Sequence, residues 1–287
     1  MMNGGLRYQF ARLSIAEKLI AINVLIFLID GLSGALLGQS FSHWFHLPKD
    51  FFEFLAQPWS LVTYSFFHAG FGHIFWNMLV LYFAGRIFLN LFDAQRFINV
   101  YFLGLILGGL VFLLSYNVFP TLVNSKTALI GASAGVNAVL IFVCAYIPNQ
   151  EVRVVFFNIK LWYIGVALVV KDLVLIGMGD NIGGGIAHLG GAFLGYMYAR
   201  QLFKGNDIGA GFTKMRNSLV DLFKPREKKA PLKTVYKKKA AAKSKADYDK
   251  QAKQRKIDTI LDKISKSGYE SLSKEEKDFL FKAGKED

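Results

Sequence analysis

The chain of 287 residues is 53% hydrophobic, yet it carries a formal net charge of +13. A single soluble domain seldom combines these properties, so the apolar and the basic residues are expected in different segments. Residues 1–200 contain 11 Lys and Arg against 8 Asp and Glu, and residues 201–287 contain 23 against 13, a net charge of +10. The composition predicts an apolar body followed by a basic tail. Cys144 is the only cysteine, which excludes an intrachain disulfide and a thiolate cluster.

Apolar segments at six places are expected to cross a membrane. A membrane-spanning helix needs roughly 20 mostly apolar residues, and lipid offers no partner for unpaired backbone groups. The segments cover about residues 19–37, 66–91, 97–119, 131–147, 159–176 and 184–202. Because the fourth is short, its N-terminal end is predicted to begin below the membrane surface. The predicted fold class is all-α, a polytopic membrane protein.

Basic residues in the connections predict the orientation, because Lys and Arg concentrate on the cytoplasmic side. With a cytoplasmic N-terminus, that side receives the tail and Arg7, Arg12, Lys18, Arg86, Arg96, Arg153, Lys160 and Arg200. The other side receives at most Lys49, Lys126 and Lys171. Both termini are then cytoplasmic. The first segment reads as a retained anchor, since no small-residue cleavage site follows it. The inner (plasma) membrane of a bacterium is the expected location.

The first external connection, residues 39–64, is too polar to span a membrane and too aromatic for a solvated loop. Its Trp and Phe side chains suit the headgroup boundary, where amphipathic rings collect, so an interfacial segment is predicted. His43 and His46 lie in it and are expected to be ordinary interfacial side chains rather than metal ligands.

Beyond Lys204 the chain becomes basic and polar. A linker, disordered or loosely helical, is predicted for residues 204–256, with a KKK run at 237–239. Apolar residues at helical spacing and a capping box of Ser273 and Glu276 predict a small cytoplasmic helical hairpin over residues 257–285. The membrane domain then covers residues 1–203. Anionic lipid is favoured over nucleic acid as the partner of the linker lysines, so no nucleic acid partner is expected.

Polar groups inside apolar segments are costly, so they are the first candidates for function, with inward-facing structural pairing as the alternative. Three clusters carry such groups. They comprise His68, His73 and Asn77 in the second segment, Ser133 between Gly131 and Gly135 in the fourth, and His188 before Gly191 and Gly195 in the sixth.

A zinc site is one explanation of the histidines. His68 and His73 are five residues apart, about 140° around a helix, and so do not share a face. The metalloprotease pattern H-E-x-x-H needs two histidines on one face and a general base beside them, and no Asp or Glu follows either histidine. No metal is therefore expected. His73 and Asn77 are four residues apart and do share a face.

Ser133 fits a nucleophile better. A Gly-x-Ser-x-Gly string alone is weak evidence, since small residues also serve close packing in membrane helices. However, an apolar helix follows it, and a serine at a helix N-terminus is surrounded by free backbone N–H groups that suit an oxyanion. Gly131 and Gly135 permit a close turn and the close approach of a substrate carbonyl.

Together these clusters resemble the rhomboid family of intramembrane serine proteases. The resemblance covers roughly residues 59–200, and its motifs stand in the family's order: His-x4-His-x3-Asn, Gly-x-Ser and Ala-His-x-x-Gly-x-x-x-Gly. It implies a six-transmembrane-helix rhomboid bundle and an intramembrane serine endopeptidase without a cofactor. The implied partners are the lipid bilayer and single-span transmembrane protein substrates.

The resemblance also implies a role for each residue. Ser133 is the nucleophile and His188 its general base, a dyad without a carboxylate. His73 and Asn77, with the Ser133 backbone N–H, form the oxyanion hole.

Four further residues support this site by the same resemblance. His68 stabilises the region by hydrogen bonding, and Gly131 belongs to the turn before the nucleophile. Gly191 and Gly195 let the sixth span pack against the fourth and bring His188 to Ser133.

The sequence departs from the family's pattern at two positions. Ser60 follows Trp59 where many relatives have arginine, and Asn137 stands where many have a tyrosine that stacks on the catalytic histidine. Asn137 shares the face of Ser133, so a hydrogen bond to His188 is expected in its place. Lys171 and Asp172 are expected to form a local ion pair that reaches outward, with part of a lateral gate as the alternative.

Two other functions remain as alternatives. An inactive rhomboid-like protein that escorts transmembrane clients would have the same fold, but the intact pair of Ser133 and His188 favours the protease. A small-solute transporter is disfavoured, since neither an inverted repeat nor paired broken helices are apparent.

Overall fold

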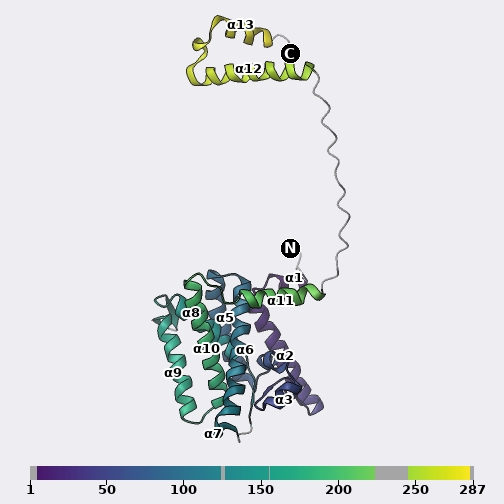
Figure 1. Cartoon of the computed structure of the whole chain (residues 1–287), viewed down its shortest axis with the longest axis vertical. Coiled ribbons are helices and arrows are strands. Elements are labelled where there is room, and N and C mark those ends of the chain that lie inside the picture. The colour runs from purple at the N-terminus through teal and green to yellow at the C-terminus, as the bar shows by residue number, and fades with distance from the viewer. Residues whose placement is uncertain (1–4, 124–126, 155, 224–244, 285–287) are drawn as a thin grey trace. The chain divides into compact units, whose positions relative to one another are not determined.

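The computed structural model describes residues 5–123, 127–154, 156–223 and 245–284, and it is mostly helical (Figure 1). Two compact units divide the chain, Met1–Lys224 and Pro225–Asp287. The long helices of the first unit are α2 (Ile15–Leu37), α5 (Phe71–Leu91), α6 (Ala94–Val118), α8 (Ser133–Tyr146), α9 (Leu161–Gly177) and α10 (Ile182–Phe203). Of the described helices, α2, α5 and α6 are long and apolar enough to cross a membrane, fewer than the six predicted spans, and α8 is a shorter apolar helix.

Helix α8 lies at the centre of the first unit, in contact with α5, α6, α9 and α10. A helix that is apolar all round is stable only when it is buried on every side. From Ser133 to Cys144 every residue of α8 is buried except Ser133 and Asn137, which are partly exposed. These two residues lie one turn apart, so they open the same face of the helix.

Small residues let α6, α8 and α10 approach one another closely. A methyl group on Gly191 would lie 2.1 Å from the Ala134 carbonyl oxygen, and one on Gly195 would lie 2.2 Å from that of Ala138. These glycines therefore fix the contact between α8 and α10, as the resemblance implies, because no larger side chain fits.

The segment between α2 and α5 folds against the helices rather than forming an open loop. It contains η1 (Phe41–Trp44), β1 (Leu47–Pro48), α3 (Phe51–Ala56), α4 (Ser60–Thr63) and η2 (Tyr64–Phe66). Leu47 and Tyr64 are fully buried, and the Tyr64 hydroxyl donates to the Leu105 carbonyl of α6 at 2.9 Å. Trp44 and Phe52 stay exposed, as an interfacial segment requires.

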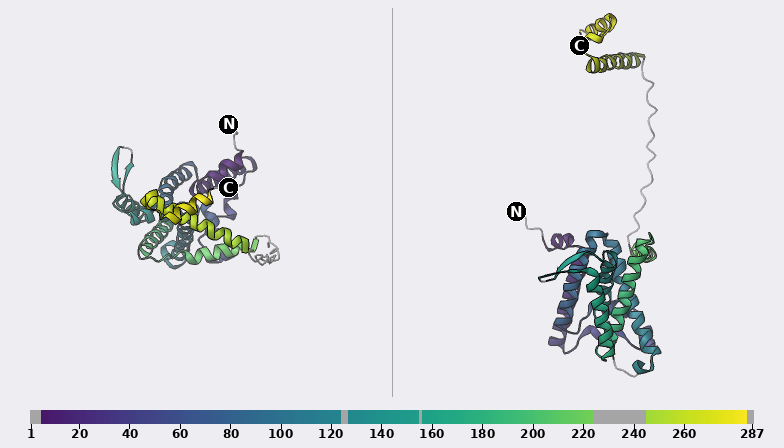
Figure 2. Two further views of the ribbon diagram at one scale, coloured as in Figure 1. Left: turned by 90° about the horizontal axis from the view of Figure 1, so that it is seen from above. Right: turned by 90° about the vertical axis from the view of Figure 1, so that its left-hand side faces the viewer.

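Two small antiparallel sheets depart from the predicted all-α class. β1 pairs with β2 (Ala128–Leu129), with Leu47 opposite Leu129, and so fixes the strand just before α8. β3 (Glu151–Val154) pairs with β4 (Phe157–Lys160) in a hairpin between α8 and α9, which extends away from the helices in Figure 2. The prediction missed both because strands of two to four residues leave too short a pattern in the sequence.

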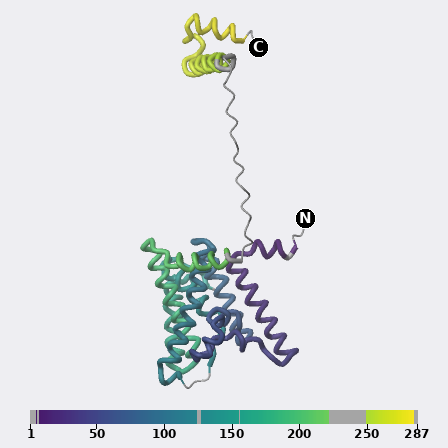
Figure 3. Tube along the Cα trace, turned by 45° about the vertical axis from the view of Figure 1, so that its right-hand side comes forward, coloured from purple at the N-terminus to yellow at the C-terminus, as the bar shows by residue number. Residues whose placement is uncertain are grey.

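Short helices lie at the two ends of the first unit. α1 (Leu6–Arg12) and α11 (Ala210–Phe223) cross the same end, which Figure 3 shows, and α7 (Pro120–Val123) lies at the other end in Figure 1. α11 falls inside residues 204–256, so this part of the predicted linker is an ordered helix. Its apolar side chains Met215, Leu219 and Val220 are exposed on one side.

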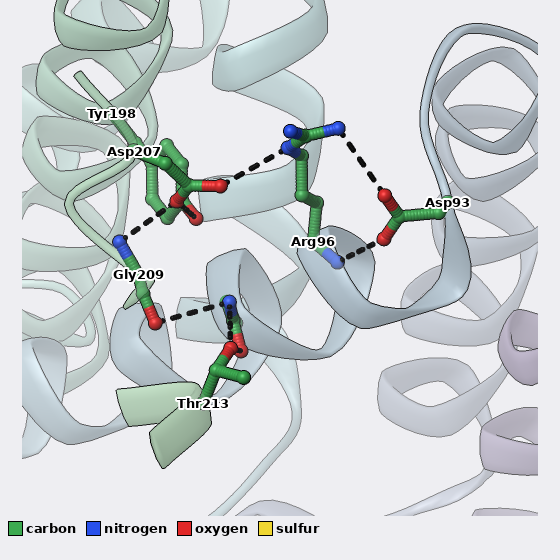
Figure 4. Close-up of polar contacts among 7 residues, drawn as sticks. Asp93, Arg96, Tyr198, Asp207, Gly209 and Thr213 are labelled. Atoms are coloured by element: carbon green, nitrogen blue, oxygen red, sulfur yellow. Dashed lines mark hydrogen bonds and ion pairs between the residues drawn. The ribbon is translucent and has the colours of Figure 1, made fainter. Parts of the chain in front are cut away.

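Asp207 fastens the chain between α10 and α11 (Figure 4). Its carboxylate pairs with Arg96 of α6 at 3.1 Å, and it accepts hydrogen bonds from the Tyr198 hydroxyl and the Gly209 N–H. Burial raises the pKa of Asp207, but the bonds from Tyr198, Arg96 and Gly209 outweigh this effect and hold the pKa below its ordinary value.

Asn99 of α6 makes the second connection to α11. Its buried side-chain amide donates to the Gly209 carbonyl at 3.2 Å and to the Thr213 hydroxyl at 2.9 Å. Because a buried amide needs partners, Asn99 holds the first turn of α11 on α6.

The second unit is a helical hairpin of α12 (Lys245–Ser267), η3 (Tyr269–Ser271) and α13 (Lys274–Ala283). The predicted capping box is present, since the Ser273 N–H donates to Glu276 at 2.8 Å and the Ser273 hydroxyl accepts from the Glu276 N–H. Lys263 of α12 pairs with Glu276 at 2.8 Å. α12 begins at Lys245 rather than near Ile257, and the KKK run at 237–239 lies outside the described residues.

Candidate active site

One cavity brings together the four residues predicted to carry the chemistry. Its volume is about 740 Å³, and Ser133, His188, His73 and Asn77 all line it. They come from three helices, α5, α8 and α10, and strand β2 forms part of the wall. Residues far apart in the sequence thus meet at one partly open site, which is the arrangement that nucleophilic catalysis requires.

Ser133 is the first residue of α8, and its side chain is partly exposed to the cavity. The first N–H groups of a helix have no partner within the helix, so they are available to an oxyanion. The turn before Ser133 is fixed by the Gly131 N–H, which donates to the Tyr64 carbonyl at 3.0 Å. Gly131 has φ 117°, a conformation that favours glycine.

His68 supports this turn, whereas His73 contacts the segment just before its own helix. The Ala132 N–H lies 3.4 Å from His68 Nε2, and the Ala69 N–H lies 3.4 Å from His73 Nδ1. Their rings stand nearly edge to face, with centroids 5.0 Å apart. His68 precedes α5 rather than lying in it, because the helix begins at Phe71, so the predicted second span starts too early.

Asn77 lies one turn after His73 on α5. Its side-chain amide donates to the His73 carbonyl at 2.9 Å, and the residue is 8% exposed. One donor of the amide is therefore occupied within the helix, while the side chain still borders the cavity.

His188 has a partner that the sequence did not predict. Its Nδ1 lies 3.1 Å from the Asp172 Oδ1, and the Asp172 side chain is 5% exposed. Lys171 Nζ contacts the same oxygen at 3.1 Å, so the predicted local ion pair is present, with Asp172 buried and the Lys171 side chain 49% exposed. A carboxylate therefore stands beside the histidine, in contrast to the expected dyad without one.

Among the described residues, His188 makes no hydrogen bond to Asn137 or to Ser133. Asn137 lines the same cavity, but among the described residues no hydrogen bond joins it to His188, whose Nδ1 faces Asp172 instead. In the same part of the chain, no hydrogen bond joins Ser133 to His188. Catalytic hydrogen bonds are often longer before substrate binds. The relevant geometry is therefore that Ser133 and His188 line the same cavity.

Comparison with known proteins adds two matches to family models. A model of the Rhomboid domain matches residues 55–205, and one of a family of unknown function (DUF6576) matches residues 244–283. The first match contains the whole cavity, and the second coincides with the helical hairpin of α12 and α13.

Two curated relatives are each similar to about half of the chain. RHOMBOID-like protein 12, mitochondrial, of Arabidopsis thaliana is 31% identical over 158 residues, which cover 51% of this chain and 47% of the relative. Presenilin-associated rhomboid-like protein A, mitochondrial, of Danio rerio is 30% identical over 141 residues, which cover 48% and 36%. The chain thus matches less than half the length of each relative. Both names specify mitochondria, which contradicts the predicted bacterial inner membrane.

Proposed function

Because this chain belongs to the rhomboid family, we propose that it is an intramembrane serine endopeptidase that cleaves single-span transmembrane proteins. The observation that carries the proposal is the position of Ser133 at the start of α8, in one cavity with His188, His73 and Asn77. In the proposed membrane domain, residues 1–203, all of α2, α5, α6, α8, α9 and α10 cross the bilayer.

In the proposed reaction, Ser133 Oγ bonds to the substrate carbonyl carbon while His188 takes the hydroxyl proton. His73, Asn77 and the Ser133 N–H stabilise the oxyanion, an effect worth about 3 kcal/mol per donor at comparable sites. His188 then gives its proton to the leaving amine as the carbon–nitrogen bond breaks. A water molecule, deprotonated by His188, attacks the acyl ester and releases the new carboxyl end, and the proton returns to Ser133.

Water and substrate must both reach the serine for this reaction. The cavity beside Ser133 is partly open, and because α8 begins at Ser133, α8 itself does not cover the nucleophile. A substrate helix has its backbone groups paired and must unwind locally before its carbonyl can reach the serine. Helix-breaking residues near a small residue at the cut are therefore expected in substrates.

The names of the relatives support a mitochondrial membrane as the location. At the end where α1 and α11 lie, Arg7, Arg12, Lys214 and Arg216 provide positive charge. Their attraction to anionic lipid headgroups supports the proposal that this end and the basic tail lie at such a surface.

The proposal is tested by cleavage of a model single-span substrate by the purified chain in proteoliposomes. Ser133→Ala and His188→Ala are each expected to abolish cleavage, while Ser42→Ala and His43→Ala, outside the cavity, serve as matched controls. Cleavage in the presence of EDTA is expected to continue, whereas sensitivity to chelation would revive a metal mechanism. If the folded wild-type chain binds the substrate without cutting it, the escort function replaces the protease.

A further inference from the structure

The buried carboxylate of Asp172 is the feature of the cavity that the proposed dyad leaves unused. It lies on α9, while His188 lies on α10, and the two helices are connected by a turn through Asn181. An ionised group inside an apolar segment is costly, so its retention points to a function or to a structural pair. Here the pair is with His188 Nδ1 at 3.1 Å.

We propose that Asp172 is a positioning residue that orients His188 and keeps its proton on Nδ1. This inference rests on the proposed protease function and replaces a dyad with a Ser133, His188 and Asp172 triad. An ionised carboxylate can only accept hydrogen bonds, so the facing nitrogen must be the donor. The other nitrogen, Nε2, is then unprotonated and can take the Ser133 proton.

Lys171 compensates the negative charge of Asp172 in this arrangement. Its Nζ lies 3.1 Å from the same Asp172 oxygen, and its side chain is 49% exposed. The positive charge of Lys171 beside the carboxylate favours the ionised form of Asp172. Asp172 can thus stay ionised while His188 is neutral. When His188 becomes an imidazolium during the reaction, the carboxylate beside it stabilises the new charge, as in soluble serine proteases.

The backbone brings α9 to the distance that this contact needs. Gly185 lies one turn before His188, and a methyl group on it would meet Ile176 Cγ1 of α9 at 2.7 Å. The Asp172 carbonyl oxygen lies 3.6 Å from the same point. A larger residue at 185 would thus push α9 away from α10 and separate Asp172 from His188 without altering either side chain.

Three variants of the full chain test the proposal by kcat and KM for one substrate. Asp172→Asn is expected to lower kcat by about 100-fold or more, since the amide can hold His188 in the wrong tautomer. KM should stay within about twofold. Asp172→Glu retains a carboxylate and should be at least about tenfold faster than Asp172→Asn. Gly185→Ala should lower kcat with both side chains intact.

Asp207→Asn is the matched control, because it removes a carboxylate charge at a pair remote from the cavity. Its kcat is expected to equal that of the wild type at a temperature where it is folded. Thermal unfolding of each variant separates lost folding from lost orientation.

The outcomes distinguish this inference from the proposed function. If the wild type cleaves and a folded Asp172→Asn loses less than about threefold in kcat, Asp172 only fastens α9 to α10 and the triad is wrong. The triad is also overturned if Asp172→Glu is no faster than Asp172→Asn. Should Asp172→Asn fail to fold, the kcat values of Asp172→Glu and Gly185→Ala relative to wild type test the proposal instead. An unchanged kcat in Gly185→Ala contradicts it. If the folded wild type cleaves nothing, the proposed function itself fails.

Discussion

A methyl group on Gly131 would lie 2.6 Å from His73 Cε1, closer than such atoms approach in proteins. The turn before Ser133 therefore fits against His73, the proposed oxyanion donor, only with glycine at position 131. Gly131 also has φ 117°, a backbone conformation that residues other than glycine rarely adopt.

Gly131→Ala is expected to abolish cleavage by displacing His73 or Ser133, and to lower the free energy of unfolding by about 1–3 kcal/mol through backbone strain. Cleavage rate and thermal unfolding measure the two effects. Gly177→Ala is the control, because nothing lies within 4 Å of a methyl group there. Full activity of Gly131→Ala would show that the turn relaxes freely.

Gly191→Ala is expected to destabilise the first unit by forcing α10 away from α8. The added methyl group would meet the Ala134 carbonyl oxygen at 2.1 Å, and overpacking of this kind costs about 1–3 kcal/mol. Thermal unfolding in detergent should show a lower midpoint, together with slower cleavage because His188 moves from Ser133. Gly34→Ala, which meets nothing within 4 Å, should leave both unchanged, and equal behaviour of the two variants would contradict the packing argument.

His73→Ala and Asn77→Ala should each lower kcat by about 100-fold, less completely than loss of Ser133, since each removes one oxyanion donor among several. Steady-state kinetics on one substrate provide the measurement. Two variants with wild-type kcat would show that the oxyanion is stabilised elsewhere.

Much of this site follows from the sequence, because its residues lie in segments whose apolar character predicts helices. The order of the motifs along the chain was enough to place Ser133 in the fourth apolar segment and His188 in the sixth. The sequence indicated the ion pair of Asp172 with its neighbour Lys171, which is present. It did not indicate the contact of Asp172 with His188, because that contact crosses between helices and has no sequence pattern. Helix α11 was missed although Met215, Leu219 and Val220 recur at helical spacing, because the surrounding charge favoured a linker.

Protonation of Asp207 is expected to loosen α11. The pKa of this carboxyl in the folded chain lies below its unfolded value, about 3.9, so its stabilising contribution is complete above that value. The contribution disappears as pH falls through the folded pKa. Unfolding midpoints of wild type and Asp207→Asn should therefore differ at pH 7 and converge as pH falls through the folded pKa. A constant difference across this range would show that the charge of Asp207 is not responsible.

Truncation separates the role of α11 from that of the hairpin. A chain ending at Lys224 keeps the contacts of Asn99 with Gly209 and Thr213, so it should cleave like the full chain. A chain ending at Gly205 loses those contacts and should unfold at a lower temperature, although every proposed catalytic residue remains. Loss of activity on truncation at Lys224 would assign the α12 and α13 hairpin a part in the reaction.

The most direct test of the central claim is labelling of the full chain by a fluorophosphonate, followed by mapping of the modified residue. A serine hydroxyl reacts with this reagent only when a base and an oxyanion site activate it. An adduct on Ser133 is expected in the wild type and in Ser42→Ala, and its absence is expected in Ser133→Ala and His188→Ala. A folded wild-type chain that shows no adduct, or one modified at a different serine, would contradict this claim.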